Sequence, residues 1–273
     1  MDKRPIGVFD SGLGGLTALR ELSALLPHEN LIYFGDTGRV PYGGRSRETI
    51  IKYARQDVAF LRRFDPKAIV IACGTVSTTS LEVLREENDL PIFGVVDPAC
   101  AEAARVTRNG KIGLIGTQAS IRSGVYERTL AELRSNVQVT AQACPLFVPL
   151  VENGRFAPGD IVVETVAREY LEPLKEAGVD TLVLGCTHYP LLREVIGSIM
   201  GPEVTLVDVG AQCARRVANQ LRERDALTNG EELGTRRYFV SDDTGDFSRT
   251  ASIFLGEDVQ GCVEQIDITS VEI

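Results

Sequence analysis

Short apolar runs alternate with longer amphipathic segments along most of the chain. The runs are rich in valine, isoleucine and leucine, which is typical of strands buried on both faces of a parallel sheet. Strands are therefore expected at 6–9, 31–34, 69–72, 92–96, 112–115, 181–184, 204–207, 238–240 and 264–269, with an extended segment over 137–151.

The segments between these runs place apolar residues three or four positions apart, as amphipathic helices do. Helices are expected at 15–26, 48–64, from 74 to about 87, and at 98–107, 120–134, 160–177, 190–200, 211–223 and 246–255. Regular alternation of strand and helix predicts an α/β fold, with parallel sheets covered by helices on both faces.

The two halves of the chain resemble each other. Residues 6–11 (IGVFDS) align with 112–117 (IGLIGT), 40–43 (VPYG) with 148–151 (VPLV), and Cys73 with Cys186. The order is the same and the separation grows slowly, which indicates a duplication, although a generic strand–helix rhythm is the alternative. A duplication predicts two pseudo-symmetric, doubly wound domains that face each other across a cleft holding the active site.

Composition and charge narrow the classes of function. The chain of 273 residues, 44% hydrophobic and 25% charged, is long enough for two ordinary soluble domains. No apolar run reaches the roughly 18 residues that cross a bilayer, and Asp10 interrupts any leader-like apolar start, so no membrane association and a cytoplasmic location are expected. A net charge of −9 argues against nucleic acid, which asks for a basic surface.

The six cysteines show no CxxC pair, and the chain is too long for a disulfide scaffold. Most are expected to be buried apolar side chains in a reducing compartment. Cys186 and His188 lack the second ligand pair that a structural zinc site requires, so no metal is expected.

Several reactive side chains directly follow predicted strands. Cys186 and His188 come after one strand, Cys73 after another, and Asp10 and Thr117 after two more. Because ligands bind beyond the carboxyl ends of parallel strands, we expect these residues to meet in one cleft. Glu152 should approach the same cleft, with an exposed loop glutamate as the alternative.

Each group suggests a chemical role. Asp10 opens a glycine-rich turn and suits a substrate ammonium or a proton transfer, although a helix cap and tight turn would explain it too. A helix start after each cysteine is expected to lower the thiol pKa towards neutrality. His188 can orient or protonate Cys186.

Two thiols on opposite sides of a substrate suit the inversion of a carbon stereocentre. One base removes a proton from one face while an acid supplies a proton to the other, and the roles exchange in the reverse direction. A Cys–His hydrolase is the rival, but it leaves Cys73 unexplained.

Five motifs follow one another along the chain: residues 7–15 (GVFDSGLGG), 40–43 (VPYG), 72–75 (ACGT), 145–152 (PLFVPLVE) and 185–191 (GCTHYPL). Together they resemble the glutamate racemase family, in the cofactor-independent aspartate/glutamate racemase superfamily, over essentially the whole chain. The resemblance implies that Cys73 and Cys186 are the catalytic acid/base pair, each serving one enantiomer, and that Asp10, Glu152 and His188 assist them. It implies substrate contacts from Asp10, Ser11, Tyr42, Gly43, Gly74, Thr75, Thr117, Thr187 and His188.

The resemblance further implies D-glutamate production for peptidoglycan, without pyridoxal phosphate, any other cofactor or metal. It also implies a first domain of residues 1–97 and 208–273, into which a second domain, 98–207, is inserted. The sequence leaves the oligomeric state open, with a homodimer as one option.

The chain departs from the family pattern at Gly74, where many members have asparagine, at Gly44, and at 208–210 (DVG). Racemisation of aspartate or another amino acid is one alternative, although His188 favours glutamate. A non-catalytic amino-acid-binding protein is the alternative of another class, and Gly74 is the feature that favours it.

Overall fold

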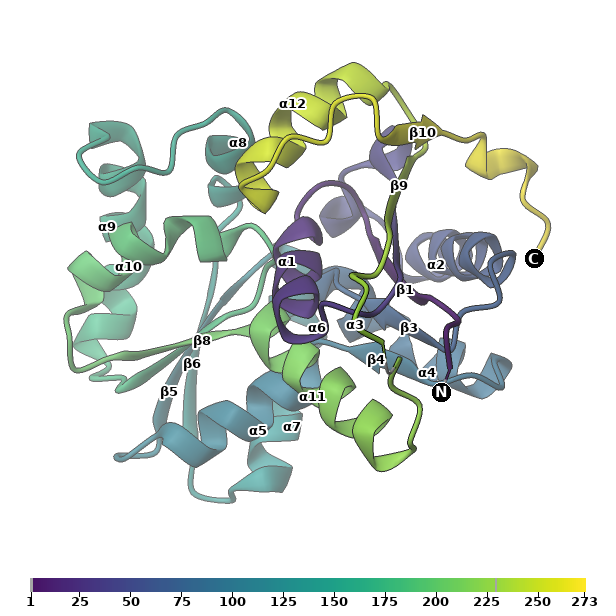
Figure 1. Cartoon of the computed structure of the whole chain (residues 1–273). Helices are drawn as coiled ribbons and strands as arrows, with labels where there is room; N and C mark the ends of the chain where they lie inside the picture. The colour runs from purple at the N-terminus through teal and green to yellow at the C-terminus, as the bar shows by residue number, and fades with distance from the viewer. Residues whose placement is uncertain (1, 229) are drawn as a thin grey trace.

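Two parallel sheets organise the chain, as the computed structural model in Figure 1 shows for residues 2–228 and 230–273. The six-stranded sheet has the order β10-β9-β2-β1-β3-β4, and the four-stranded sheet the order β6-β5-β7-β8. The first contains β1 (Ile6–Asp10), β2 (Leu31–Gly35), β3 (Ala68–Ile71), β4 (Ile92–Gly94), β9 (Arg236–Val240) and β10 (Val263–Gln265). The second contains β5 (Lys111–Gly116), β6 (Gln138–Ala143), β7 (Thr181–Leu184) and β8 (Thr205–Asp208).

Helices connect and cover these strands. Those of the first half are α1 (Leu16–Leu25), η1 (Thr37–Arg39), η2 (Tyr42–Gly44), α2 (Arg47–Arg62), α3 (Gly74–Thr79), α4 (Leu81–Glu87), α5 (Val96–Val106), α6 (Gln118–Ser123) and α7 (Val125–Leu133). The remainder are α8 (Phe147–Glu152), α9 (Ile161–Glu176), η3 (Tyr189–Leu192), α10 (Arg193–Met200), α11 (Val209–Glu223), α12 (Thr244–Leu255) and η4 (Ile268–Ser270).

The two sheets repeat one topology, which confirms the predicted fold class. The order β2-β1-β3-β4 in the first matches β6-β5-β7-β8 in the second, and β9 and β10 extend the first sheet at one edge. In register, Phe9 pairs with Phe34 and Ile71, so the segments that follow β1, β2 and β3 leave the sheet side by side. We refer to the elements around the two sheets as the first and second lobes.

Burial explains why the central strands read as continuous apolar runs. All residues of β1, β3 and β7 are buried, because helices cover both faces of each sheet. The edge strand β6 is only partly buried and alternates apolar with polar residues. Helices α1 and α11 pack against each other between the sheets, as Figure 1 shows.

Several predicted elements differ from the structure. The extended segment predicted for 137–151 is wrong beyond residue 143, because 147–152 form helix α8. Pro149 falls in the first turn of α8, where a missing N–H breaks no helical hydrogen bond. The last predicted strand, 264–269, is only Val263–Gln265, and Asp267 then caps the turn η4.

Three predicted helices are each two shorter pieces. The break between α3 and α4 is at Ser80, and that between α6 and α7 is at Gly124, whose φ of 62° is the left-handed conformation that glycine adopts freely. Segment 189–192 is a 3₁₀ turn ahead of α10.

The proposed domain limits lie within secondary-structure elements, and residue 208 is the last residue of β8. The chain passes from β4 into α5, which packs on β7 and β8, and it returns through β8 and α11. Helix α5 begins at Val96, so the limit proposed at residue 97 lies in its first turn. In the part of the chain that the structure describes, no helix combines the length and apolar character needed to cross a membrane.

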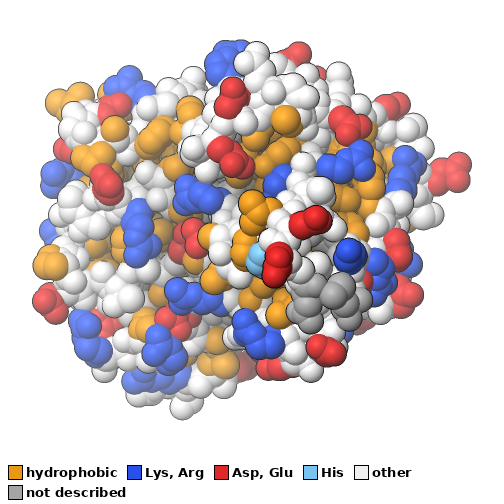
Figure 2. Space-filling model, viewed as in Figure 1, with side chains coloured by type: hydrophobic (Ala, Val, Ile, Leu, Met, Phe, Trp, Pro, Cys, Tyr) orange, Lys and Arg blue, Asp and Glu red, His pale blue; other side chains and the backbone are white. Residues whose placement is uncertain are grey.

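Charged side chains of both signs are interspersed on the face that Figure 2 shows, rather than gathered into a basic stripe.

Candidate active site

One cavity of about 450 Å³ lies between the lobes, at the carboxyl ends of β1, β3, β5 and β7. Its lining includes every residue predicted for the site: Asp10, Ser11, Tyr42, Gly43, Cys73, Gly74, Thr75, Thr117, Glu152, Cys186, Thr187 and His188. The strand ends that were expected to meet do so.

Cys73 and Asp10 form the first-lobe side of the cavity. Cys73 follows β3 and caps α3, and its thiol donates a hydrogen bond to the Ser11 hydroxyl at 3.5 Å. Asp10 ends β1, and its Oδ2 accepts a hydrogen bond from the Gly12 N–H at 3.0 Å. Its Oδ1 is buried and has no hydrogen-bond partner among the described residues.

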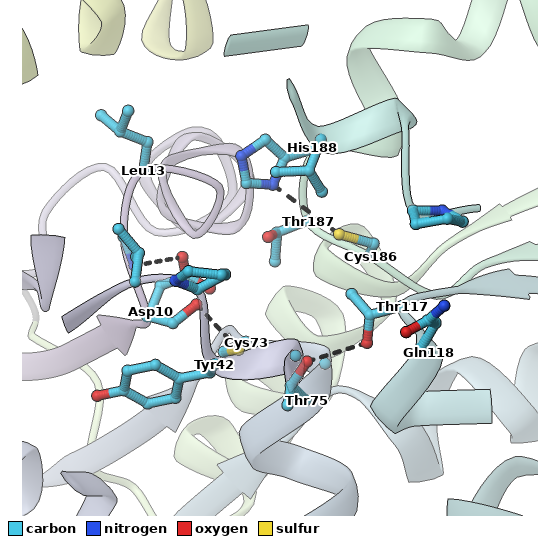
Figure 3. Close-up of a pocket in the computed structure, with 18 of the residues that line it drawn as sticks. Asp10, Leu13, Tyr42, Cys73, Thr75, Thr117, Gln118, Cys186, Thr187 and His188 are labelled. Atoms are coloured by element: carbon cyan, nitrogen blue, oxygen red, sulfur yellow. Dashed lines mark hydrogen bonds between the residues drawn. The ribbon is translucent and has the colours of Figure 1, made fainter. Parts of the chain in front are cut away.

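Cys186, His188 and Glu152 form the second-lobe side. The Cys186 sulfur lies 3.9 Å from His188 Nδ1, and His188 Nε2 lies 2.9 Å from Glu152 Oε1. The imidazole also contacts the Phe254 ring edge to face, with ring centroids 5.4 Å apart. Figure 3 shows Cys73 and Cys186 approaching the same space from opposite sides.

The lobes touch at several points beside the cysteines. The hydroxyls of Thr75 and Thr117 are 3.1 Å apart across the cleft, and the Thr17 hydroxyl donates to the Thr187 carbonyl at 2.9 Å. Gly14 packs so tightly that an added Cβ would lie 2.1 Å from Thr187 Oγ1. The two lobes are therefore in direct contact close to the proposed catalytic cysteines.

The expectation that the Cys73 thiol pKa is lowered towards neutrality is wrong for this structure. Burial, and next the carboxylate of Asp10, raise the pKa of Cys73 to about 12. Burial also raises the pKa of Asp10 above its usual value. The short helix α3 does not offset these effects, so Cys73 is a protonated thiol at neutral pH.

The histidine behaves in the opposite way. Burial alone lowers the pKa of His188, but the hydrogen bonds to Cys186 and Glu152 outweigh it and raise that pKa to about 10. His188 is therefore an imidazolium at neutral pH, placed between a sulfur and a carboxylate. This arrangement can supply a proton to Cys186 or stabilise its thiolate.

Tyr42 lines the cavity, but its hydroxyl donates to Asp36. Figure 3 shows this hydroxyl pointing away from the two cysteines. Sequence reasoning missed Leu13, Gln118 and Pro149 as lining residues. Gln118 directly follows Thr117 after a predicted strand, and this position could have indicated it.

Among residues 2–228 and 230–273, no three His, Cys, Asp or Glu side chains are grouped as metal binding requires.

The chain is similar to known proteins over nearly its whole length. The family model for Asp/Glu/Hydantoin racemase matches residues 17–217. A curated glutamate racemase of Geobacter metallireducens is 48% identical over 256 residues, covering 94% of each chain. Glutamate racemase RacE1 of Bacillus anthracis superposes with a TM-score of 0.92 at 36% identity, covering 98% of each chain.

A third relative carries a bound amino acid. Glutamate racemase of Francisella tularensis, solved in complex with D-glutamate, has a TM-score of 0.90 and 35% identity, covering 99% of this chain and all of that one. By its matched motifs, its fold and these similarities, the chain belongs to the Asp/Glu/hydantoin racemase family.

Proposed function

We propose that this protein is an isomerase that interconverts L-glutamate and D-glutamate, with Cys73 and Cys186 as the two acid/base residues. One observation carries the proposal: two thiols enter one cavity from the ends of β3 and β7, which occupy equivalent places in the two sheets. Relatives named glutamate racemase cover nearly the whole chain, and one was solved with D-glutamate, which supports glutamate as the substrate.

The proposed reaction exchanges one proton for another at the α carbon. The thiolate of one cysteine takes the α proton, the C–H electrons stay on carbon, and the thiol of the other cysteine forms the new C–H bond on the opposite face. The first cysteine ends protonated and the second ends as a thiolate, so the roles are exchanged for the return reaction. General acid–base steps of this kind contribute about 10²–10⁴-fold in rate.

The neighbours of each thiol support the roles proposed for them. Asp10 lies beside Cys73, and one of its oxygens is buried with no hydrogen-bond partner in the part of the chain that the structure describes, which suits assistance to that thiol or contact with the substrate ammonium. On the other side of the cavity, His188 and Glu152 are placed to assist Cys186 in the same way.

Hydroxyls and backbone N–H groups are available for the substrate carboxylates. The described lining of the cavity contains Ser11, Thr75, Thr117 and Thr187 and no lysine or arginine. Ser11 and Thr117 follow equivalent strands, β1 and β5. We propose that these hydroxyls, with Gly43 and Gly74 backbone, bind the amino-acid head and side-chain carboxylate.

We also propose a cytoplasmic enzyme that supplies D-glutamate to peptidoglycan. A homodimer is part of this proposal, and sedimentation at micromolar concentration would test it.

The decisive experiment incubates the protein with L-glutamate in deuterated water without any added cofactor. We expect D-glutamate that carries deuterium at the α carbon. Faster turnover of aspartate than of glutamate would establish the alternative substrate instead. Glutamate binding without racemisation or exchange would indicate a non-catalytic amino-acid-binding protein.

A further inference from the structure

A buried polar cluster lies directly behind the wall of the cavity. It joins Asp36, at the end of β2, to Arg39 and Tyr42 on the following turns and to Gln56 and Asp57 on α2. The side chains of Asp36 and Asp57 are completely buried, and that of Arg39 is 12% exposed. The racemisation chemistry uses none of these charged groups.

The hydrogen-bond geometry of this cluster requires one more proton than it would hold with both aspartates ionised. The Tyr42 hydroxyl contacts Asp36 Oδ2 closely and lies 3.3 Å from Asp57 Oδ2. A phenol has a single proton, so it can donate to only one of these carboxyl groups. If that proton goes to Asp36, the contact with Asp57 is favourable only when Asp57 is the donor.

The charge balance also requires one extra proton on the Asp36–Asp57 pair, and the hydrogen bonds of Tyr42 assign it to Asp57. Arg39 Nε lies 2.6 Å from Asp36 Oδ2, and Arg39 Nη2 lies 2.9 Å from Asp57 Oδ1. Two ionised carboxyl groups against one guanidinium would leave a net negative charge in the interior, which is strongly unfavourable. A proton on Asp57 leaves the cluster neutral.

The other groups around Arg39 and Asp36 do not remove the need for this proton. Gln56 accepts a hydrogen bond from Arg39 at 2.6 Å, and the Tyr53 ring covers the guanidinium at 4.1 Å from its centroid. The Ser241 hydroxyl donates to Asp36 Oδ1 at 2.8 Å, and Asp10 adds a further negative charge. Burial, and next the charge of Asp36, raise the pKa of Asp57 well above its usual value.

The cluster fixes the turn that forms the cavity wall. Val40, Pro41, Gly43 and Gly44 line the cavity, while the Tyr42 side chain between them is anchored in the cluster. An added Cβ at Gly43 would lie 3.6 Å from Thr117 Cβ, so this turn also packs against the second lobe. The position of this turn therefore determines how the cavity wall contacts the substrate.

We propose that Asp57 is a positioning residue that remains protonated at neutral pH and, through Tyr42, holds the wall 40–44 in its binding position. The inference rests on the proposed function for its kinetic readout only. The chain of donors runs from Asp57 to Tyr42 to Asp36, and the guanidinium of Arg39 balances the one charge that remains.

The test compares Asp57→Asn with Asp57→Ala. An amide is neutral and can donate to Tyr42 and accept from Arg39, so Asp57→Asn should leave KM for L-glutamate and the Kd of D-glutamate nearly unchanged. Asp57→Ala and Tyr42→Phe should raise both about tenfold, with a smaller change in kcat, as expected when buried partners are left unsatisfied. Glu86→Gln, a carboxyl-to-amide change at an exposed position of α4, is the matched control.

Two readouts would separate this role from a merely structural one. At alkaline pH, KM should rise more steeply in the unaltered protein than in Asp57→Asn, because both proteins lose the His188 proton but only the unaltered protein also loses a proton from Asp57. The infrared band of a protonated carboxyl group should be present in the unaltered protein at pH 7 and lose intensity in Asp57→Asn but not in Glu86→Gln.

An ionised Asp57 in the infrared spectrum would overturn the proposal. The proposal would also be overturned if Asp57→Asn bound D-glutamate as weakly as a folded Asp57→Ala variant does. Failure of the proposed function is a separate result, because it would appear as absent racemisation in the unaltered protein while calorimetric binding and the infrared band stay measurable.

Discussion

Gly74 and Gly185 meet backbone to backbone across the cleft: a Cβ added at Gly74 would lie 2.6 Å from the Gly185 carbonyl oxygen. Each glycine adjoins a cysteine of the proposed pair, so this contact sets how closely the two thiol-bearing segments approach. The asparagine found here in many members of the family could be accommodated only if the end of β7 moved away. Gly74 therefore lacks the side-chain contact that an asparagine would make, and it also determines how closely the two lobes approach each other in this chain.

Gly74→Ala should hold the lobes further apart. The new methyl group meets a backbone oxygen, and overpacking of this kind costs about 1–3 kcal/mol. We expect a higher KM for glutamate, a lower kcat and a larger radius of gyration by small-angle scattering. Gly44→Ala is the control, because no atom lies within 4 Å of its added Cβ. Equal behaviour of the two variants would show that the contact at Gly74 does not limit closure.

Replacing either proposed catalytic thiol should stop net racemisation. A serine hydroxyl is a far weaker acid than a thiol, so Cys73→Ser or Cys186→Ser should each lose about 10²–10⁴-fold in kcat. The assay is circular dichroism of glutamate in both directions. Cys262→Ser, at the exposed cysteine, should retain full turnover. Retained turnover in either site variant would defeat the two-base assignment.

Much of this architecture could be predicted from the sequence, because buried parallel strands leave continuous apolar runs. The runs that became β1, β3 and β7 end next to Asp10, Cys73 and Cys186. Strand order places Asp10 and Cys73 at one edge of the first sheet, and the packing of the two lobes brings Cys186 of the second sheet to the same cavity. Helix α8 could not be predicted in the same way, since its pattern with Pro149 reads equally well as an extended segment.

The pKa values and charge states of the site could not be predicted from local sequence patterns. The high pKa of Cys73 arises from burial and from Asp10 on another strand, and the sequence around Cys73 shows neither. Asp36, Arg39 and Asp57 read as ordinary surface charges in the sequence. Only the packing of α2 against the turns after β2 makes them a buried cluster.

The raised pKa of Cys73 predicts its alkylation profile. Because only the thiolate reacts, the rate with iodoacetamide should rise about tenfold per pH unit and continue to rise through pH 10. The pKa of about 12 means that no plateau is reached in this range. Mass spectrometry of the two peptides would compare Cys73 with exposed Cys262 in the same sample. A plateau for Cys73 below pH 9 would contradict the burial of its charge.

The raised pKa of His188 predicts how stability depends on pH. The folded protein holds a proton on His188 up to a pKa of about 10, whereas an unfolded histidine releases it near 6.5. The stabilisation is therefore complete below pH 6.5 and is lost as the pH rises towards 10. Between pH 7 and 9 the free energy of unfolding should fall by up to about 1.4 kcal/mol per pH unit from this group.

Urea unfolding of the unaltered protein, His188→Asn and Glu152→Gln would measure this contribution. His188→Asn should flatten the profile, and Glu152→Gln should shift the decline to lower pH, because it removes the carboxylate 2.9 Å from Nε2. His28→Asn, at the chain's other histidine, is the control and should follow the unaltered protein. If His188→Asn kept the same slope, the imidazolium between Cys186 and Glu152 would not be the folded-state species, and Cys186 would have to draw its proton from another group.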